Sequence, residues 1–137
     1  MIYITREDLE TDAFERLINE STTESILDRT EGKVLGIVSS YLSGRYDAIL
    51  IFDPEAPIRD ELLADIVSRI VLYRTFRRNA ARKVPEDVAT DYGWAMKELL
   101  RIQKGETILD LPAPLDGEGN PESNTMFGNN TNEDFYI

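Results

Sequence analysis

The clearest hydrophobic pattern lies in the second half of the chain. Apolar residues recur there at steps of four, three, four and three positions: Val88, Tyr92, Ala95, Leu99 and Ile102. This spacing places them on one face of an α-helix. Pro85 before the stripe and Gly105 after it are typical helix boundaries. Trp94 lies off the stripe, so it either anchors a partner or packs against the preceding helix.

An apolar segment from about residue 57 to residue 79 predicts that preceding helix. Its apolar positions cover more than one helical face: Leu62, Leu63, Ile66, Val67, Ile70, Val71, Leu72, Tyr73 and Phe76. Acidic residues occupy its first turns and arginines its last turns, which matches the direction of a helix dipole. The pattern indicates a central helix that is buried on most sides.

Two more helices are predicted in the N-terminal part of the chain. Thr5 is a good N-cap, so a short helix is expected from about Arg6, with a possible break before Phe14. The next helix follows residues 21–24 and ends at residues 43–44, because its apolar residues fall at helical steps between these points.

Two glycines lie inside that second helix, and each costs about 1 kcal/mol relative to alanine. Gly32 and Gly36 have two interpretations. They allow the close approach of another helix, or they mark a bend or a helix start near Glu31.

The connector between the second and third helices contains a short apolar run. Residues 48–52 read Ala-Ile-Leu-Ile-Phe, a composition typical of a strand. Pro54 and Pro57 end the run and introduce the next helix. We therefore expect a short extended connector at this point.

The chain changes character after Gly105. Residues 107–112 look extended, and residues 116–137 contain five acidic residues, no Lys or Arg, and many Gly and Asn. Such a segment does not fold alone. The sequence thus predicts an all-α fold with a four-helix bundle-like domain, residues 1–105, and a long extended C-terminal arm, residues 106–137.

The predicted arm nevertheless carries a set of apolar side chains: Leu109, Leu111, Met126, Phe127, Phe135, Tyr136 and Ile137. Apolar anchors separated by flexible residues are typical of segments that order on a partner. We therefore expect these residues to bind a neighbouring protein.

Composition excludes several kinds of chemistry. The 137 residues include no Cys and no His. Disulfides, thiolate nucleophiles, zinc–cysteine sites and histidine-based proton transfer therefore cannot be built here. We expect no catalytic residue, no cofactor and no metal. No apolar run approaches the roughly 18 residues of a membrane span, and residues 1–5 do not resemble a signal peptide.

The formal net charge of −11 disfavours tight binding to nucleic acid, because such binding depends on neutralising phosphates. One basic cluster stands out: Arg74, Arg77, Arg78, Arg82 and Lys83. It indicates either contact with a phosphate or an acidic partner, or stabilisation of a helix end combined with pairing to the chain's own carboxylates.

Four segments, in order, resemble the Mu-like phage neck proteins. Residues 4–9 are similar to their N-terminal signature, and residues 41–46, YLSGRY, resemble the turn after their second helix. Residues 58–78 look like their third helix, and residues 92–105 resemble their last helix and its glycine stop. The resemblance covers roughly residues 2–112. The apolar connector and the segment after residue 115 depart from it.

The resemblance implies a head–tail connector, also called an adaptor or head-completion protein. Such proteins form a ring, commonly of twelve copies, beneath the portal of a DNA-filled capsid, and they join capsid to tail. The implied partners are the portal protein, other copies of the chain, and the next neck or tail component. Genomic DNA would pass through the channel without specific binding. The implied location is the virion neck, reached from the host cytoplasm during assembly.

Two alternatives to the connector remain. The first is a tail-completion or tail-terminator protein at the top of the tail tube. The second belongs to a different class, a small helical DNA-binding regulator, and the basic cluster is its only support.

Overall fold

The computed structural model describes residues 1–13, 15–78 and 83–114. These residues contain helices and no strand, which confirms the predicted all-α fold. The helices are α1 (Arg6–Asp12), α2 (Glu15–Ser21), α3 (Glu24–Leu42), α4 (Ala48–Ile51), α5 (Glu61–Arg77) and α6 (Glu86–Lys104). The end of α1 and the start of α2 confirm the break predicted before Phe14.

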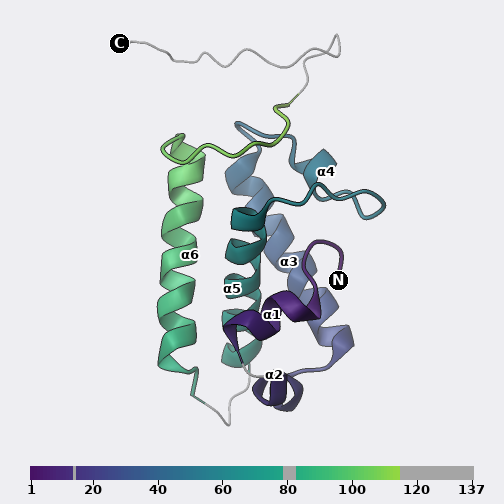
Figure 1. Ribbon diagram of the computed structural model, residues 1–137, viewed down its shortest axis with the longest axis vertical. Helices are drawn as coiled ribbons and strands as arrows, with labels where there is room; N and C mark the ends of the chain where they lie inside the picture. The colour runs from purple at the N-terminus through teal and green to yellow at the C-terminus, as the bar shows by residue number, and fades with distance from the viewer. Residues whose placement is uncertain (14, 79–82, 115–137) are drawn as a thin grey trace.

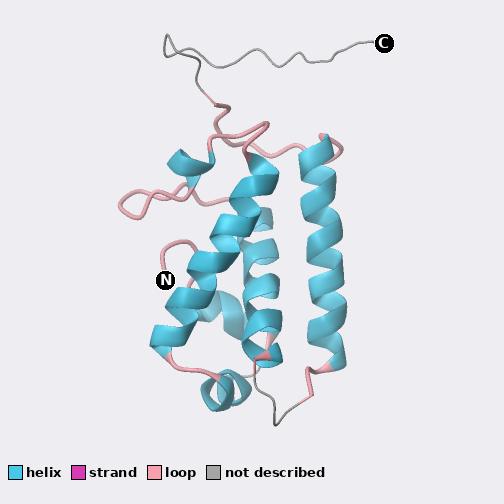
Figure 2. Cartoon of the chain, turned by 180° about the vertical axis from the view of Figure 1, so that it is seen from behind, coloured by secondary structure: helices cyan, strands magenta, loops and turns pink. Residues whose placement is uncertain are grey.

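The three long helices form a bundle with α5 in the middle (Figure 1), and Figure 2 shows the same order from behind. Helix α5 contacts α1, α3 and α6. Its buried residues are Leu63, Ala64, Ile66, Val67, Ser68, Ile70, Val71, Leu72, Thr75 and Phe76. These residues surround the helix, so the prediction of a central buried helix is confirmed. Burying each large apolar side chain stabilises the fold by about 1.5–3 kcal/mol.

A buried carboxylate holds the first residues of the chain against α3. Glu31 is 1% exposed. One of its oxygens accepts the N–H of Ile2 at 2.6 Å, and the other accepts the N–H groups of Tyr3 and Ile4, both at 2.9 Å. The N-terminal segment therefore satisfies its backbone donors with a side chain instead of a strand partner.

Tyr3 ties the same segment to the start of α5. Its hydroxyl donates to the Ile58 carbonyl at 2.9 Å and accepts from the Asp60 N–H at 3.0 Å. Burial raises the pKa of the Tyr3 phenol. Its ring packs edge-to-face on Phe52, with centroids 4.9 Å apart. Tyr3 and Ile4 are thus part of the core, and Met1 packs against it.

Helix α3 runs unbroken through both of its glycines. It begins at Glu24 after the N-cap Thr23, so the helix start proposed near Glu31 is wrong. A Cβ placed on Gly32 or Gly36 would meet nothing within 4 Å. No described helix of this chain therefore approaches either glycine closely, and close approach by a helix of a partner stays a prediction.

The apolar run at residues 48–52 is not a strand. Residues Ala48–Ile51 form the single-turn helix α4, and the Asp47 carboxylate caps it by accepting the Leu50 N–H at 3.1 Å. Ile51 is fully buried, whereas Ile49 is 88% exposed. A strand needs a neighbour for its backbone groups, and a helical turn satisfies them locally.

The segment that follows α6 folds back onto the bundle. Leu109 is buried, and its N–H donates to the Tyr46 hydroxyl at 2.9 Å. The Asp47 N–H donates to the Pro112 carbonyl, also at 2.9 Å. Residues 106–114, which the sequence assigns to the arm, therefore pack on the helical domain.

Replacing Gly105 with alanine should destabilise the domain by about 1–2 kcal/mol. Gly105 has a φ of +82°, and its new Cβ would lie 2.7 Å from the Arg45 guanidinium. That guanidinium donates to the carbonyls of Gln103 and Lys104 at the end of α6. Gly32→Ala is the matched control, because open space and helical backbone predict a gain of up to about 1 kcal/mol. Urea unfolding should give opposite signs, and the same sign in both variants would contradict this account.

Candidate functional site

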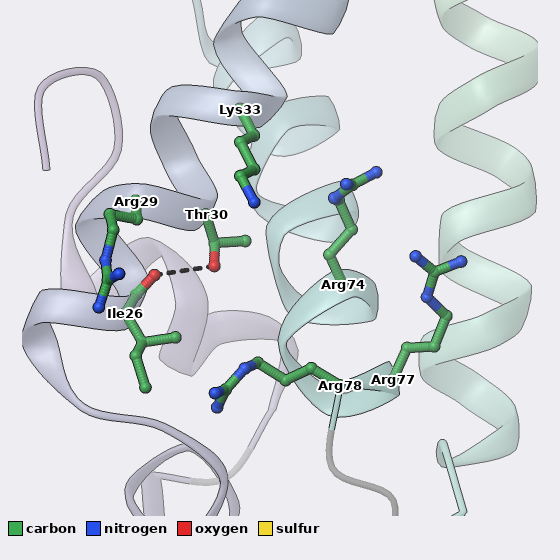
Figure 3. A pocket seen from close by; sticks show the side chains of 7 residues that line it. All are labelled: Ile26, Arg29, Thr30, Lys33, Arg74, Arg77 and Arg78. Atoms are coloured by element: carbon green, nitrogen blue, oxygen red, sulfur yellow. Dashed lines mark hydrogen bonds between the residues drawn. The ribbon is translucent and has the colours of Figure 1, made fainter.

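Three arginines predicted as partner-binding residues line a groove between α3 and α5. Figure 3 shows Arg74, Arg77 and Arg78 extending from α5, while Arg29 and Lys33 extend from α3. Ile26 and Thr30 lie between the two sets of cations. The groove has a volume of about 370 Å³. We call these seven residues the basic groove.

The cations of the basic groove form no ion pair with any carboxylate that the structure describes. Among the residues that the structure describes, no ion pair joins any of the five to a carboxylate. Other arginines are paired closely: Arg59 lies 2.9 Å from Asp8, and Arg101 lies 2.9 Å from Glu98. No described carboxylate therefore pairs with the cluster, and its role as a contact for an anionic partner stays a prediction.

Two interactions position the side chains that line the groove. The Thr30 hydroxyl donates to the Ile26 carbonyl of its own helix at 2.8 Å, which leaves the Thr30 methyl and the Ile26 side chain as an apolar floor. The Arg77 guanidinium lies 5.9 Å from the centre of the Tyr73 ring, and Tyr73 stacks on Tyr92 of α6 at 4.0 Å. Guanidinium groups stay protonated at neutral pH, so this groove is suited to binding an anion.

Sequence reasoning missed the α3 side of this groove. Arg29 and Lys33 are far from Arg74 in the sequence, although their spacing of four residues places them on one helix face. Arg82, which was grouped with the cluster, lies outside the described residues, and Lys83 is exposed but does not line the groove.

A second surface is apolar and lies at the other end of the bundle. Ile49 is 88% exposed, Leu50 is 44% exposed and Ile108 is 82% exposed. The hydrogen bond between Asp47 and Pro112 holds α4 beside the segment that carries Ile108. We call Ile49, Leu50 and Ile108 the α4 end. Large apolar side chains left exposed at one end of a domain are candidates for an interface.

The predicted arm anchors divide into two groups. Leu109 is buried in the core, and Leu111 is half-buried against it, so both contribute to this chain's own fold. The other anchors, Met126, Phe127, Phe135, Tyr136 and Ile137, lie outside the described residues.

The remaining candidate features are structural. The Arg69 guanidinium lies 4.9 Å from the centre of the Trp94 ring, which supports packing of this tryptophan on α5. Arg59 bridges Asp8 of α1 and Glu61 of α5. Its hydrogen bonds lower the pKa of both carboxyls.

Two other kinds of site are absent from the described residues. The described ranges contain no cluster of three or more acidic residues placed to hold a metal ion. No helix within them has the length and apolar character needed to cross a bilayer.

Comparison with known proteins gives one family-level result. The family described as Bacteriophage Mu, Gp36 matches residues 3–128, which extends past the resemblance seen to residue 112 and includes both surfaces. Neither the curated proteins nor the solved structures gave a match. Because the match spans nearly the whole sequence, the chain belongs to the bacteriophage Mu Gp36 family.

Proposed function

We propose that this chain is a structural protein of the phage neck. In this proposal it is a head–tail connector subunit, without catalytic activity, that forms a ring beneath the portal and extends the DNA channel. Its partners are the portal protein, further copies of itself, and the next neck or tail component. Membership of a family of phage proteins supports the assignment to a phage.

The α4 end is the observation that carries this proposal. The domain buries a continuous core, yet it leaves Ile49 and Ile108 almost fully exposed at one end. Exposed apolar surface of this kind is costly in water unless a partner covers it. We assign this surface to contact with another protein of the neck.

The charge of the chain also agrees with a DNA conduit. A net charge of −11 repels the phosphate backbone over most of the surface, so a duplex can pass without being held. A tail-completion protein would need the same property. The position of the chain in a particle map separates these two roles.

The proposal predicts that Ile49→Asp combined with Ile108→Asp abolishes incorporation into necks. Both side chains are exposed, so the melting temperature of the purified variant should stay close to that of the wild type. Complementation of a phage that lacks this gene, followed by analysis of purified particles, measures incorporation. Ala89→Asp combined with Thr90→Asp adds the same charge at two exposed positions of α6 and is the control. Normal necks containing the double variant would overturn the proposed interface.

The basic groove favours one competing function, a DNA-binding regulator. Its five unpaired cations are the only support for this role among the described residues. A mobility-shift experiment at low salt discriminates the two. Tight, salt-sensitive binding to a duplex would favour the regulator and contradict the connector.

A further inference from the structure

We propose that the basic groove binds the acidic segment 116–137 of a neighbouring copy of this chain. This inference rests on the proposed ring and names the contact that closes it. The groove supplies the cationic side of the contact, and the C-terminal segment supplies the anionic side.

Charge complementarity is the first argument. The groove holds five cations without a described carboxylate partner, in a chain whose net charge is −11. Residues 116–137 carry five acids and no Lys or Arg. Arginine binds carboxylates through paired, charge-assisted hydrogen bonds, and this geometry makes it specific for such partners. Binding of the acidic segment in the groove offsets the repulsion among the cations of the groove and the repulsion among the acids of the segment.

Apolar complementarity is the second argument. The last five residues combine Glu133 and Asp134 with Phe135, Tyr136 and Ile137. The groove likewise combines cations with an apolar floor, formed by the half-buried Ile26 and Thr30. A segment with acids beside aromatic residues matches this arrangement better than a nucleic-acid backbone, whose phosphates and sugars offer no aromatic side chain.

Position is the third argument. The described chain ends at residue 114 beside α4, whereas the groove lies at the opposite end of the bundle, near the start of α3 and the end of α5 (Figure 1). A tail at one end and its acceptor at the other form two different patches. Rings require such heterologous contacts, in which one patch meets a different patch on the neighbour. Twenty-two residues can span at most about 75 Å, whereas a helix of 19 residues such as α6 is about 28 Å long.

The absence of cysteine from the sequence allows a direct test. Two full-length variants are coexpressed, one with Thr30→Cys in the groove and one with Phe135→Cys in the segment. We expect a disulfide-linked dimer of the two chains in isolated necks and in concentrated solutions of the purified protein. Thr90→Cys paired with Phe135→Cys is the control, and it should give little dimer. Equal yields in the two mixtures would overturn the proposal.

Charge reversal provides an independent readout. Arg74→Glu with Arg78→Glu should weaken self-association about tenfold, because two ionic contacts are replaced by repulsion. Glu133→Lys with Asp134→Lys should do the same. Mixing the two variants should restore association, since the unchanged acidic segment of one meets the unchanged groove of the other. Failure of this rescue would contradict the inference.

The outcomes separate this inference from the proposed function. Cross-linking in solution by a chain that is absent from necks would support the contact and overturn the neck role. Normal necks without the cross-link would overturn the contact alone. A chain carrying both cysteines that forms only an intrachain disulfide would show that each segment occupies its own groove. Loss of duplex binding in Arg74→Glu with Arg78→Glu, without any cross-link, would assign the groove to DNA instead.

Discussion

Replacing Glu31 with leucine should lower the free energy of unfolding by about 3–5 kcal/mol, the largest loss we expect from a single substitution. The side chain is 1% exposed and accepts the N–H groups of Ile2, Tyr3 and Ile4. Leucine fills a similar volume but leaves these three donors without a partner. Each buried donor that loses its acceptor costs about 1–3 kcal/mol.

The conservative variant sharpens this prediction. In Glu31→Gln the amide oxygen can still accept from Tyr3 and Ile4, which share one carboxylate oxygen, so about half of the loss should remain. Glu24→Gln is the control, because its side chain is 67% exposed and its pair with Arg6 is worth less than about 1 kcal/mol. Urea unfolding measures the stabilities, and hydrogen exchange follows the amides of residues 2–4. A Glu31→Leu protein within 1 kcal/mol of wild type would show that this carboxylate is not the anchor.

Replacing Leu99 with alanine should cost about 3 kcal/mol, whereas replacing its neighbour Leu100 should cost under about 1 kcal/mol. Leu99 is fully buried where α6 packs on the bundle, and Leu100 is 41% exposed. Both substitutions make the same chemical change in the same turn of the helix. The difference between them therefore measures the cavity left in the core.

Thermal unfolding provides the measurement for this pair. A loss of 3 kcal/mol corresponds to a fall in melting temperature of about 10 °C for a domain of this size. Equal shifts for the two variants would mean that α6 does not dock through the face that carries Leu99. The interpretation of the α4 end would then fail, because α6 leads directly into the segment that carries Ile108.

Local signals explain why most helices could be predicted. Thr5 accepts the Asp8 N–H and Asp8 accepts the Thr5 N–H, so a complete capping box fixes the start of α1. Gly105 adopts the left-handed conformation that ends α6. The stripe from Val88 to Ile102 needs only helical periodicity to place its residues in the core. These features act within one turn and are visible in the sequence.

The connector could not be predicted because the deciding information is not local. A run of five apolar residues fits a buried strand or a helical turn equally well by periodicity. The capping carboxylate of Asp47, the burial of Ile51 and the packing of the partly buried Phe52 against the core select the helical turn here. Likewise, the packing of Leu109 depends on Tyr46, which lies in a distant loop.

Only the α5 side of the basic groove could be predicted from the sequence. Arg74, Arg77 and Arg78 stood out because they are clustered in the sequence. Arg29 and Lys33 join them only because α3 packs beside α5 in the fold. The sequence also left open whether the cluster pairs with the chain's own acids, and the structure shows no such pair with any described carboxylate.

The single tryptophan gives the protein a built-in optical reporter. Trp94 lies on α6 beside Arg69 of α5, with 39% of its surface exposed. Its emission should shift to the red when α5 and α6 separate, because the indole then becomes fully hydrated. It does not line the basic groove or the α4 end, so assembly should leave its spectrum unchanged. Fluorescence can therefore follow integrity of the domain while a second method follows assembly.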